Sequence, residues 1–238
     1  MREVLSSKGA KKRVAIAAAN LVKDGQVVGL GTGSTANYMV EELGRRIREE
    51  KLGIVGVPTS NATAELAQKH GISLTTLSEH PRLDIAIDGA DQVDPNLDLI
   101  KGMGGALTRE KIVDEASRQL IIIVDEGKIV SRLGVGQVIP VEVVPFAIPI
   151  VESKLRDLGG RPSMRQSKDG RGKFITDNCN NILDVDFGEI DDARRLERAI
   201  KLISGVVESG LFVDMTRTVF VGGTDGVRKL EKNKGQEK

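Results

Sequence analysis

Short aliphatic runs alternate with amphipathic segments through the first half of the chain. The runs are rich in valine, isoleucine and leucine, and the segments between them have apolar residues at helical spacing. This alternation indicates a parallel β-sheet with helices on both faces. We therefore predict an α/β fold with strands at 27–30, 54–57, 83–87 and 120–124, and helices over 14–22, 36–47, 61–69 and from 105 onward.

The pattern changes after residue 135. Four short strand candidates follow with only two helical segments between them, and this order is typical of an antiparallel α+β arrangement. The strand candidates are residues 138–144, 161–166, 173–177 and 181–187, and the helices are 150–158 and 191–203. Residues 218–221 again have the composition of a buried strand. The chain is therefore predicted to return to the first sheet.

This change divides the chain into two predicted domains. Residues 136–210 are expected to form an inserted α+β domain that supports assembly or covers the site. Residues 1–135 together with 211–238 are expected to form the main domain. The final segment 228–238 is almost wholly charged or polar, so we expect its last residues to be solvated.

Composition limits the partners of the chain. Thirty-five basic and 34 acidic residues give a net charge of +1, which provides no electrostatic footprint for nucleic acid or an anionic membrane. The one cysteine, Cys179, excludes a disulfide framework and is expected to be an unreactive thiol in a cytoplasmic protein. The longest apolar-rich stretch, 138–151, is interrupted by Glu142 and three prolines, so we predict no membrane span. The expected ligand is a small molecule.

A glycine-rich turn, GLGTGSTA over residues 29–36, joins the first predicted strand to the next helix. Backbone N–H groups in such a turn bind anions together with the helix N-terminus, and neighbouring hydroxyl groups add donors. The glycine spacing fits neither the dinucleotide pattern nor a P-loop, which disfavours a whole nucleotide. The alternative is a tight turn in which Ser34 or Thr35 caps the helix. For the similar turn 58–63 we expect capping.

Two acidic residues and a lysine follow later strands. Asp88 directly follows the strand 83–87, and Asp91 comes three residues later. Ligands of open parallel sheets bind beyond the carboxyl ends of the strands, where Asp88 is expected to project, although Asp-Gly is also an ordinary turn. Lys101 begins a second glycine-rich segment that leads into a helix carrying Glu110. Together these features predict a site for a small phosphorylated carbonyl compound.

Five motifs carry a wider pattern. They are GLGTGSTA (29–36), DGADQVD (88–94), KGMGGALTREKI (101–112), DEGK (125–128) and VGGTDGV (221–227). In this order they resemble the type A ribose-5-phosphate isomerases over nearly the whole chain. Gln92 stands where that family usually has glutamate, and Met103 where it often has glycine. The resemblance implies a Rossmann-like parallel-sheet domain with a smaller, inserted α+β domain of the ferredoxin-like type.

The resemblance also implies an activity. The family interconverts D-ribose 5-phosphate and D-ribulose 5-phosphate through a cis-enediolate, in the pentose phosphate pathway, without metal or organic cofactor. Glu110 matches the general base, which works best when limited solvent access raises its pKa toward the working pH. Asp88 matches the residue that handles hydroxyl protons during ring opening and enediol formation. Lys101, with the backbone of Gly102 and Gly104, matches the groups that stabilise the developing oxyanion.

The remaining matches concern substrate binding and assembly. Asp91 corresponds to a ligand of a substrate hydroxyl group. Lys128 and Lys11 are expected to supply positive charge to the phosphate, with Lys8 and Lys12 as alternatives to Lys11. The residues implied to bind the phosphate itself are Thr32, Gly33, Ser34 and Thr35. Dimers or tetramers are usual in the family, so we expect a homodimer or a homotetramer.

Three other classes of function fit parts of the pattern. A sugar-phosphate-sensing module of a transcription regulator would keep the phosphate loop, but this chain has little net positive charge and no added N-terminal helix-turn-helix. Related enzymes include a carboxylate-transferring enzyme and an amino-sugar-phosphate isomerase/deaminase; the latter would use a histidine, and neither His70 nor His80 lies in a motif. A Mg²⁺ enzyme could use Asp88, Asp91 and Asp94, because clustered carboxylates hold hard cations.

Overall fold

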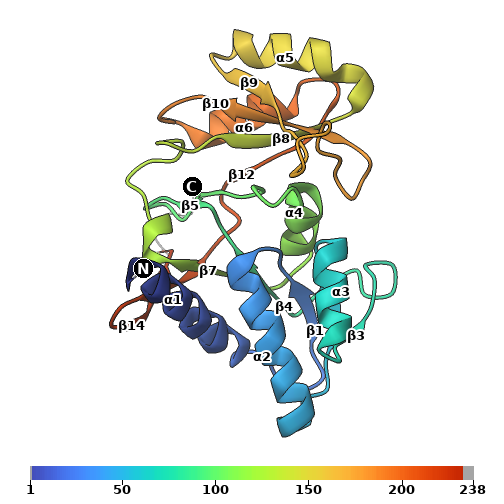
Figure 1. The fold of residues 1–238 in the computed structure, drawn as a ribbon, viewed down its shortest axis with the longest axis vertical. Helices are drawn as coiled ribbons and strands as arrows, with labels where there is room; N and C mark the ends of the chain where they lie inside the picture. Colours follow the sequence, from blue (N-terminus) through green and yellow to red (C-terminus); the bar gives the residue numbers. More distant parts are fainter. Residues whose placement is uncertain (1, 233–238) are drawn as a thin grey trace. The chain divides into compact units, whose positions relative to one another are not determined.

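The chain folds into two compact units. The computed structural model describes the backbone of residues 2–232 and the side chains of residues 7–232. Figure 1 shows the helices and strands coloured along the sequence. The first unit comprises Met1–Ala90, Arg109–Ile129 and Asp214–Lys238, and the second comprises Asp91–Thr108 and Val130–Val213.

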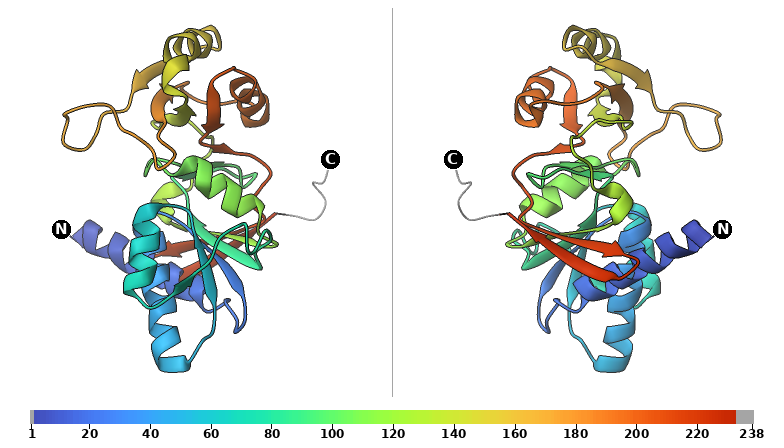
Figure 2. Two further views of the ribbon diagram at one scale, coloured as in Figure 1. Left: turned by 90° about the vertical axis from the view of Figure 1, so that its right-hand side faces the viewer. Right: turned by 90° about the vertical axis from the view of Figure 1, so that its left-hand side faces the viewer.

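A seven-stranded sheet forms the centre of the first unit. Its strands are β1 (Val27–Leu30), β2 (Val55–Pro58), β3 (Ser73–Leu74), β4 (Ile85–Gly89), β7 (Leu120–Asp125), β13 (Thr218–Gly223) and β14 (Gly226–Glu231). Their order is β14-β13-β7-β4-β1-β2-β3. All neighbours are parallel except β13 and β14, which form the antiparallel hairpin drawn in red in the right-hand view of Figure 2. The predicted parallel sheet and the return of the chain to it are confirmed.

Helices cover both faces of this sheet. They are α1 (Arg2–Ala19), α2 (Ser34–Glu50), α3 (Asn61–Lys69) and α4 (Leu107–Glu115). Successive side chains of a strand point to opposite faces. On β4, Ile85 and Ile87 join the core formed with α1 and α2, whereas Ala86 lies on the side of Val113 of α4. Asp88, two residues after Ala86, therefore projects on the α4 side.

A β-α-β-β-α-β segment forms most of the second unit. Its elements are β8 (Ile139–Val143), α5 (Ile148–Asp157), β9 (Arg161–Met164), β10 (Asn181–Asp186), α6 (Ala193–Lys201) and β11 (Val206–Ser209). The strand order is β11-β8-β10-β9, and all neighbours are antiparallel, which is the ferredoxin-like arrangement. Val141 and its register partner Leu183 pack with Val151 and Leu155 of α5. Because side chains alternate, Asp184 of β10 points to the opposite face.

A small three-stranded sheet completes the second unit and was not predicted. It consists of β5 (Gln92–Val93), β6 (Leu99–Ile100) and β12 (Leu211–Phe212), all antiparallel. One carboxylate oxygen of Asp94 accepts the backbone N–H groups of Asn96 and Asp98, at 2.8 and 2.9 Å, and shapes the turn between β5 and β6. Strands of two residues are too short to produce a detectable alternation of apolar and polar residues.

The strand predicted at 173–177 is wrong. This segment forms turns and extended chain around a buried carboxylate. The Thr176 hydroxyl donates to Oε1 of Glu142 at 2.9 Å and accepts the backbone N–H of Asn180 at 3.1 Å. Glu142 is fully buried, so polar groups of the segment satisfy its carboxylate instead of joining a ladder of strands.

The C-terminal segment 228–238 is described only in part. Its described part includes β14, in which Arg228 and Lys229 are exposed, and charged side chains on an edge strand oppose pairing with further strands. The residues predicted to be solvated at the end of 228–238 lie, from 233 onward, outside the described residues. Within residues 2–232, no helix is both long enough and apolar enough to cross a membrane.

The two compact units divide the chain differently from the predicted domains. Residues 91–108 belong to the second unit, which also extends to residues 130 and 213 instead of 136 and 210. The reason is that the strands β5, β6 and β12 form a sheet of their own instead of joining the parallel sheet. That 136–210 folds as an inserted domain stays a prediction.

Candidate active site

The glycine-rich turn after β1 contacts Asp88 in the first unit. The Thr32 N–H donates to Oδ1 of Asp88 at 3.0 Å, and the Gly89 N–H donates to the same oxygen at 2.7 Å. A Cβ atom on Gly31 would overlap the Asp88 side chain, so only glycine allows this close approach. The fold therefore brings a predicted phosphate loop and a predicted catalytic carboxylate into direct contact.

Gly33 is the N-cap of helix α2. It has φ +123°, which favours glycine, and no side chain caps the helix. The alternative that Ser34 or Thr35 is the N-cap is therefore wrong. Thr35 is buried in the first helical turn, whereas Gly33 and Ser34 are exposed. The first backbone N–H groups of α2 thus keep the capacity to bind an anion.

Lys11 of α1 contacts the same turn. Its Nζ donates to the Ser34 hydroxyl at 3.1 Å and lies 3.9 Å from Oδ2 of Asp125, which ends β7. Lys8 and Lys12, the two alternatives left open by the sequence, are exposed to solvent. Lys128 lies in the short 3₁₀ helix η1 (Glu126–Lys128) directly after β7. Lys11 is consequently the lysine of α1 that reaches the glycine-rich turn.

The hydroxyl group of Thr32 belongs to a cluster of hydroxyl groups. Its Oγ1 lies 2.7 Å from that of Thr59, 2.9 Å from Oγ of Ser60 and 3.0 Å from Oγ1 of Thr63. Ser60 also accepts the backbone N–H of Thr63 at 3.0 Å as the N-cap of α3. The capping expected for the turn 58–63 is confirmed, and that turn supports the glycine-rich turn from the side.

Glu110 lies at the same end of the sheet as Asp88, and both side chains are buried. A Cβ atom on Gly29 would lie 2.7 Å from Val113 and 2.8 Å from the Cβ of Ala86, so Val113 faces β1 and β4. Glu110 precedes Val113 by three residues and shares its helix face. Because α4 connects parallel strands, it runs opposite to them, and its N-terminal turn lies nearer their carboxyl ends.

Lys101 is buried in the second unit. Its Nζ lies 5.2 Å from the centroid of the Phe212 ring, a cation–π contact, and its backbone N–H donates to the Gly210 carbonyl at 2.9 Å. Asp91, predicted to bind a substrate hydroxyl, accepts the Met103 N–H at 3.1 Å through Oδ2. This contact joins the acidic turn to the lysine-glycine loop, which we define as residues 101–105.

Two glycines of the lysine-glycine loop have left-handed backbone conformations. Gly102 has φ +93° and Gly105 has φ +87°. A Cβ atom on Gly102 would lie 2.6 Å from Leu107, and one on Gly105 would overlap the ring of Phe174. Gly104, in contrast, is exposed. The loop therefore needs glycine for its close contacts and still presents backbone at the surface.

Arg165 was not predicted from the sequence. It follows β9, and its Nη1 donates to the carbonyl oxygens of Gly102 and Met103, at 3.1 Å each. Its Nε donates to Asp184 at 2.8 Å. An arginine near the end of a short strand candidate carries no signal of its own, because most such residues are solvated. Only the folded chain shows that it holds the lysine-glycine loop.

The two departures from the family pattern have local explanations. Gln92 donates through Nε2 to the Val135 carbonyl and accepts the Gly134 N–H through Oε1, both at 2.8 Å. A carboxylate could accept but not donate, so the amide suits both partners. Met103 uses its backbone N–H and C=O in the contacts described above, and these do not depend on its side chain.

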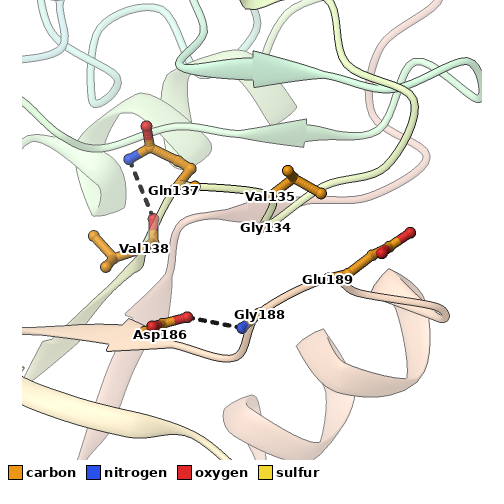
Figure 3. A pocket seen from close by; sticks show the side chains of 8 residues that line it. Gly134, Val135, Gln137, Val138, Asp186, Gly188 and Glu189 are labelled. Atoms are coloured by element: carbon orange, nitrogen blue, oxygen red, sulfur yellow. Dashed lines mark hydrogen bonds between the residues drawn. The ribbon is translucent and has the colours of Figure 1, made fainter.

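A pocket of about 480 Å³ opens elsewhere in the second unit (Figure 3). Asp186 and Glu189 contribute its charged side chains, and Asp186 accepts the Gly188 N–H at 2.8 Å. A hydrogen bond from Arg161 holds the pKa of Asp186 below its usual value, so its carboxylate stays negative. Negative charge opposes a sugar phosphate, so this pocket does not fit the predicted substrate. Its lining is Gly134, Val135, Gly136, Gln137, Val138, Asp186, Gly188 and Glu189.

The remaining candidate residues take part in local contacts of turns and helix ends. Among residues 7–232, no three histidine, cysteine or acidic side chains come together as a possible metal site. Asp94 shapes the turn between β5 and β6, as described above. His70 is the C-cap of α3, and Nδ1 of His80 lies 2.8 Å from the Thr75 hydroxyl. Cys179 is exposed and lies in the turn after Thr176.

Known proteins are similar in sequence to most of this chain. The sequence pattern of ribose 5-phosphate isomerase A (phosphoriboisomerase A) matches residues 55–226. The chain is 49% identical over 220 residues to ribose-5-phosphate isomerase A of Methanosarcina acetivorans, covering 92% of this chain and 93% of the relative. It is 51% identical over 213 residues to that of Thermosynechococcus vestitus, covering 89% of this chain and 90% of the relative.

Solved structures agree with these sequence relatives. Ribose 5-phosphate isomerase A of Methanocaldococcus jannaschii superposes with a TM-score of 0.92 at 49% identity, covering 95% of this chain and 100% of that one. A D-ribose-5-phosphate isomerase in complex with phospho-erythronic acid has a TM-score of 0.92 at 41% identity, covering 94% of this chain and 99% of that one. The chain described here therefore belongs to the ribose 5-phosphate isomerase A family.

Proposed function

We propose that this chain interconverts D-ribose 5-phosphate and D-ribulose 5-phosphate through a cis-enediolate, as an aldose–ketose isomerase of the pentose phosphate pathway. Membership of the family supports the activity. The observation that carries the proposal is the contact between the glycine-rich turn and Asp88, through the Thr32 N–H at 3.0 Å. It joins an anion-binding helix N-terminus to a buried carboxylate, which suits a substrate with a phosphate at one end and a reacting carbonyl at the other.

The proposed reaction assigns one task to each catalytic side chain. Asp88 handles the hydroxyl proton during opening of the furanose ring. Glu110 removes the proton from C2, and negative charge develops on the enediolate oxygen atoms. Lys101 and the backbone N–H groups of the lysine-glycine loop stabilise this charge, since preorganised donors act most strongly where charge develops. Asp88 also carries the hydroxyl proton of O2 to O1, and Glu110 then returns its own proton to C1, which yields the ketose and restores the carboxylate.

The proposed binding residues hold the unreactive parts of the substrate. The phosphate is assigned to the backbone and hydroxyl groups at the start of α2, and Lys11 and Lys128 supply positive charge. The contact of Lys11 with Ser34 at 3.1 Å supports this assignment for Lys11. Asp91 is assigned to a sugar hydroxyl. The residues proposed at the phosphate are Thr32, Gly33, Ser34 and Thr35.

We also propose a homodimer or homotetramer in the cytoplasm. Large apolar side chains are exposed on the second unit, and such exposure is typical of surfaces that become covered. Phe146 is 96% exposed and Leu202 is 84% exposed. Residues 136–210, which include both, are proposed to support this assembly. Size-exclusion chromatography with light scattering measures the assembly state, and a monomer at micromolar concentration would refute the proposal.

The activity is tested by incubating the purified chain with D-ribose 5-phosphate and measuring the ketose formed. We expect ketose at a rate proportional to protein, before and after thorough chelation, because the proposed steps use only side chains and backbone groups. Activity lost on chelation and restored by Mg²⁺ would favour the acidic-cluster alternative instead. Binding of the sugar phosphate without any ketose would favour a sensing module. Release of ammonia from an amino-sugar phosphate would favour the deaminase.

A further inference from the structure

Arg165 has no role in the proposed reaction steps, but it contacts the lysine-glycine loop directly. Within the second unit, its Nη1 donates to the carbonyl oxygens of two consecutive residues of the lysine-glycine loop, Gly102 and Met103, at 3.1 Å each. One guanidinium nitrogen thus fixes two neighbouring peptide groups. The Arg165 side chain is only 10% exposed.

The guanidinium group is itself held in place. Nε donates to one oxygen of Asp184 at 2.8 Å, Nη2 donates to the other, and the pair is the bidentate arrangement that orients an arginine most firmly. The Phe174 ring lies against it, with 5.8 Å between the ring centroid and Cζ. The same ring closes over Gly105, where a Cβ atom would overlap it. Asp184 and Phe174 therefore fix the orientation of the Arg165 guanidinium group next to the loop.

A fixed carbonyl group fixes the N–H of the next residue. The peptide unit is planar and trans, so its C=O and N–H bonds point in opposite directions. Because the Met103 carbonyl is held by Arg165, the Gly104 N–H must point away from the guanidinium group. The preceding peptide is fixed at both ends, since its carbonyl, from Gly102, binds Arg165 and its N–H, from Met103, binds Asp91.

We propose that Arg165 is a positioning residue that holds the Met103–Gly104 peptide so that the Gly104 N–H is directed at the developing enediolate oxygen. The inference rests on the proposed isomerase function and extends it to a residue outside the motifs. Gly104 is exposed, and its N–H points away from Arg165. The fixed orientation stabilises the transition state, because an N–H group that already points at the oxyanion needs no reorganisation when charge develops.

The second unit provides a matched control. Arg161 lies on the same strand, four residues before Arg165, and pairs with Asp186, two residues after Asp184, at 2.7 Å. Both arginines thus pair with alternate aspartates of β10. Arg161 is 77% exposed, so its pair with Asp186 is open to solvent. The variant R161M removes an arginine–aspartate pair from the same two strands without touching the loop.

The experiment measures kcat and KM with D-ribose 5-phosphate for the wild type, R165M, R165K and R161M, with thermal melts of each. We expect R165M to lower kcat about 10- to 100-fold, less than outright loss of an oxyanion donor, with KM within about threefold. R165K keeps a charge for Asp184 but lacks the planar fork, so its kcat should lie between those of R165M and the wild type. R161M should keep the wild-type kcat.

The outcomes separate the inference from the proposed function. A wild-type chain that forms no ketose refutes the function itself. An active wild type with folded R165M at wild-type kcat overturns the role of Arg165. Equal losses in R165M and R161M would mean a general effect of breaking a pair on these strands, and would also overturn it. If R165M does not melt cooperatively, R165K decides: an unchanged kcat overturns the inference, and a loss of several-fold supports it.

Discussion

The molecule carries two glycine-rich turns, and they are held in different ways. The turn after β1 is fixed by neighbours on the same sheet: Gly31 packs against Asp88, and Thr32 donates to it at 3.0 Å. The lysine-glycine loop is fixed by two side chains from the segment of the second unit between β9 and β10, Arg165 and Phe174. The first turn ends in a helix N-terminus that is exposed, while Lys101 of the second is buried.

This difference matches a division of tasks. A phosphate that does not react needs a binding site that is equally good in the ground state and the transition state, and the helix N-terminus with Lys11 is proposed to provide it. An enediolate forms only during the reaction, so its donors must be rigidly aimed beforehand. We therefore expect changes in the first turn to affect KM, and changes around the second loop to affect kcat.

The largest expected effect concerns Glu110, on the helix that follows the lysine-glycine loop. The variant E110Q keeps the shape and removes the base, so kcat should fall about 10² to 10⁴-fold while ribose 5-phosphate still binds. Glu115, exposed at the end of the same helix, offers the control E115Q, which should keep full activity. Steady-state kinetics and calorimetric binding measure both. A folded E110Q enzyme near the wild-type rate would place the base elsewhere.

The next prediction compares how much one added Cβ atom in each turn lowers the free energy of unfolding. G105A adds a Cβ atom that overlaps the Phe174 ring, at a φ of +87°, and should cost about 2 to 4 kcal/mol of unfolding free energy. G33A adds one into open space at φ +123°, so only backbone strain of about 1 to 2 kcal/mol is expected. Urea denaturation gives both values. Equal costs would show that the Phe174 contact does not constrain the loop.

A smaller effect is expected at the first turn. The double change T32A and S34A should raise KM about tenfold with little change in kcat, because hydrogen bonds to the phosphate are lost equally in both states. S60A removes a hydroxyl of the same cluster and the cap of α3, so it should lower stability and leave KM unchanged. An active double variant with the wild-type KM would mean that Thr32 and Ser34 have only a structural role and do not bind the phosphate.

The smallest effect separates the lysines of α1. K11M should raise KM about threefold, and less so at high salt, because a partly exposed charge is screened by ions. K12M removes an exposed lysine one position away and should change nothing. The two KM values at low and high ionic strength provide the comparison. A larger effect for K12M than for K11M would contradict the contact between Lys11 and Ser34.

The two turns also differ in how well they could be predicted from the sequence. The turn after β1 is contiguous, so its glycines, hydroxyls and following helix could be recognised together, and the parallel strands had a clear pattern. Arg165 and Gly102 are 63 residues apart, and nothing local marks an arginine that will hold a distant carbonyl. Likewise, Thr176 leaves an expected strand to satisfy buried Glu142, an interaction that exists only after folding. Local patterns predict elements, whereas supporting contacts need the tertiary structure.

The central claim is that a carboxylate moves a proton between C1 and C2 of the sugar phosphate. The most direct test holds the wild-type enzyme at equilibrium with ribose 5-phosphate in D₂O for many turnovers and follows the substrate by proton NMR. A proton on a carboxylic acid exchanges with solvent, so the account predicts that deuterium accumulates at C2 of ribose 5-phosphate and at C1 of ribulose 5-phosphate, even if each turnover exchanges little. Continued interconversion without any deuterium at either carbon would contradict it.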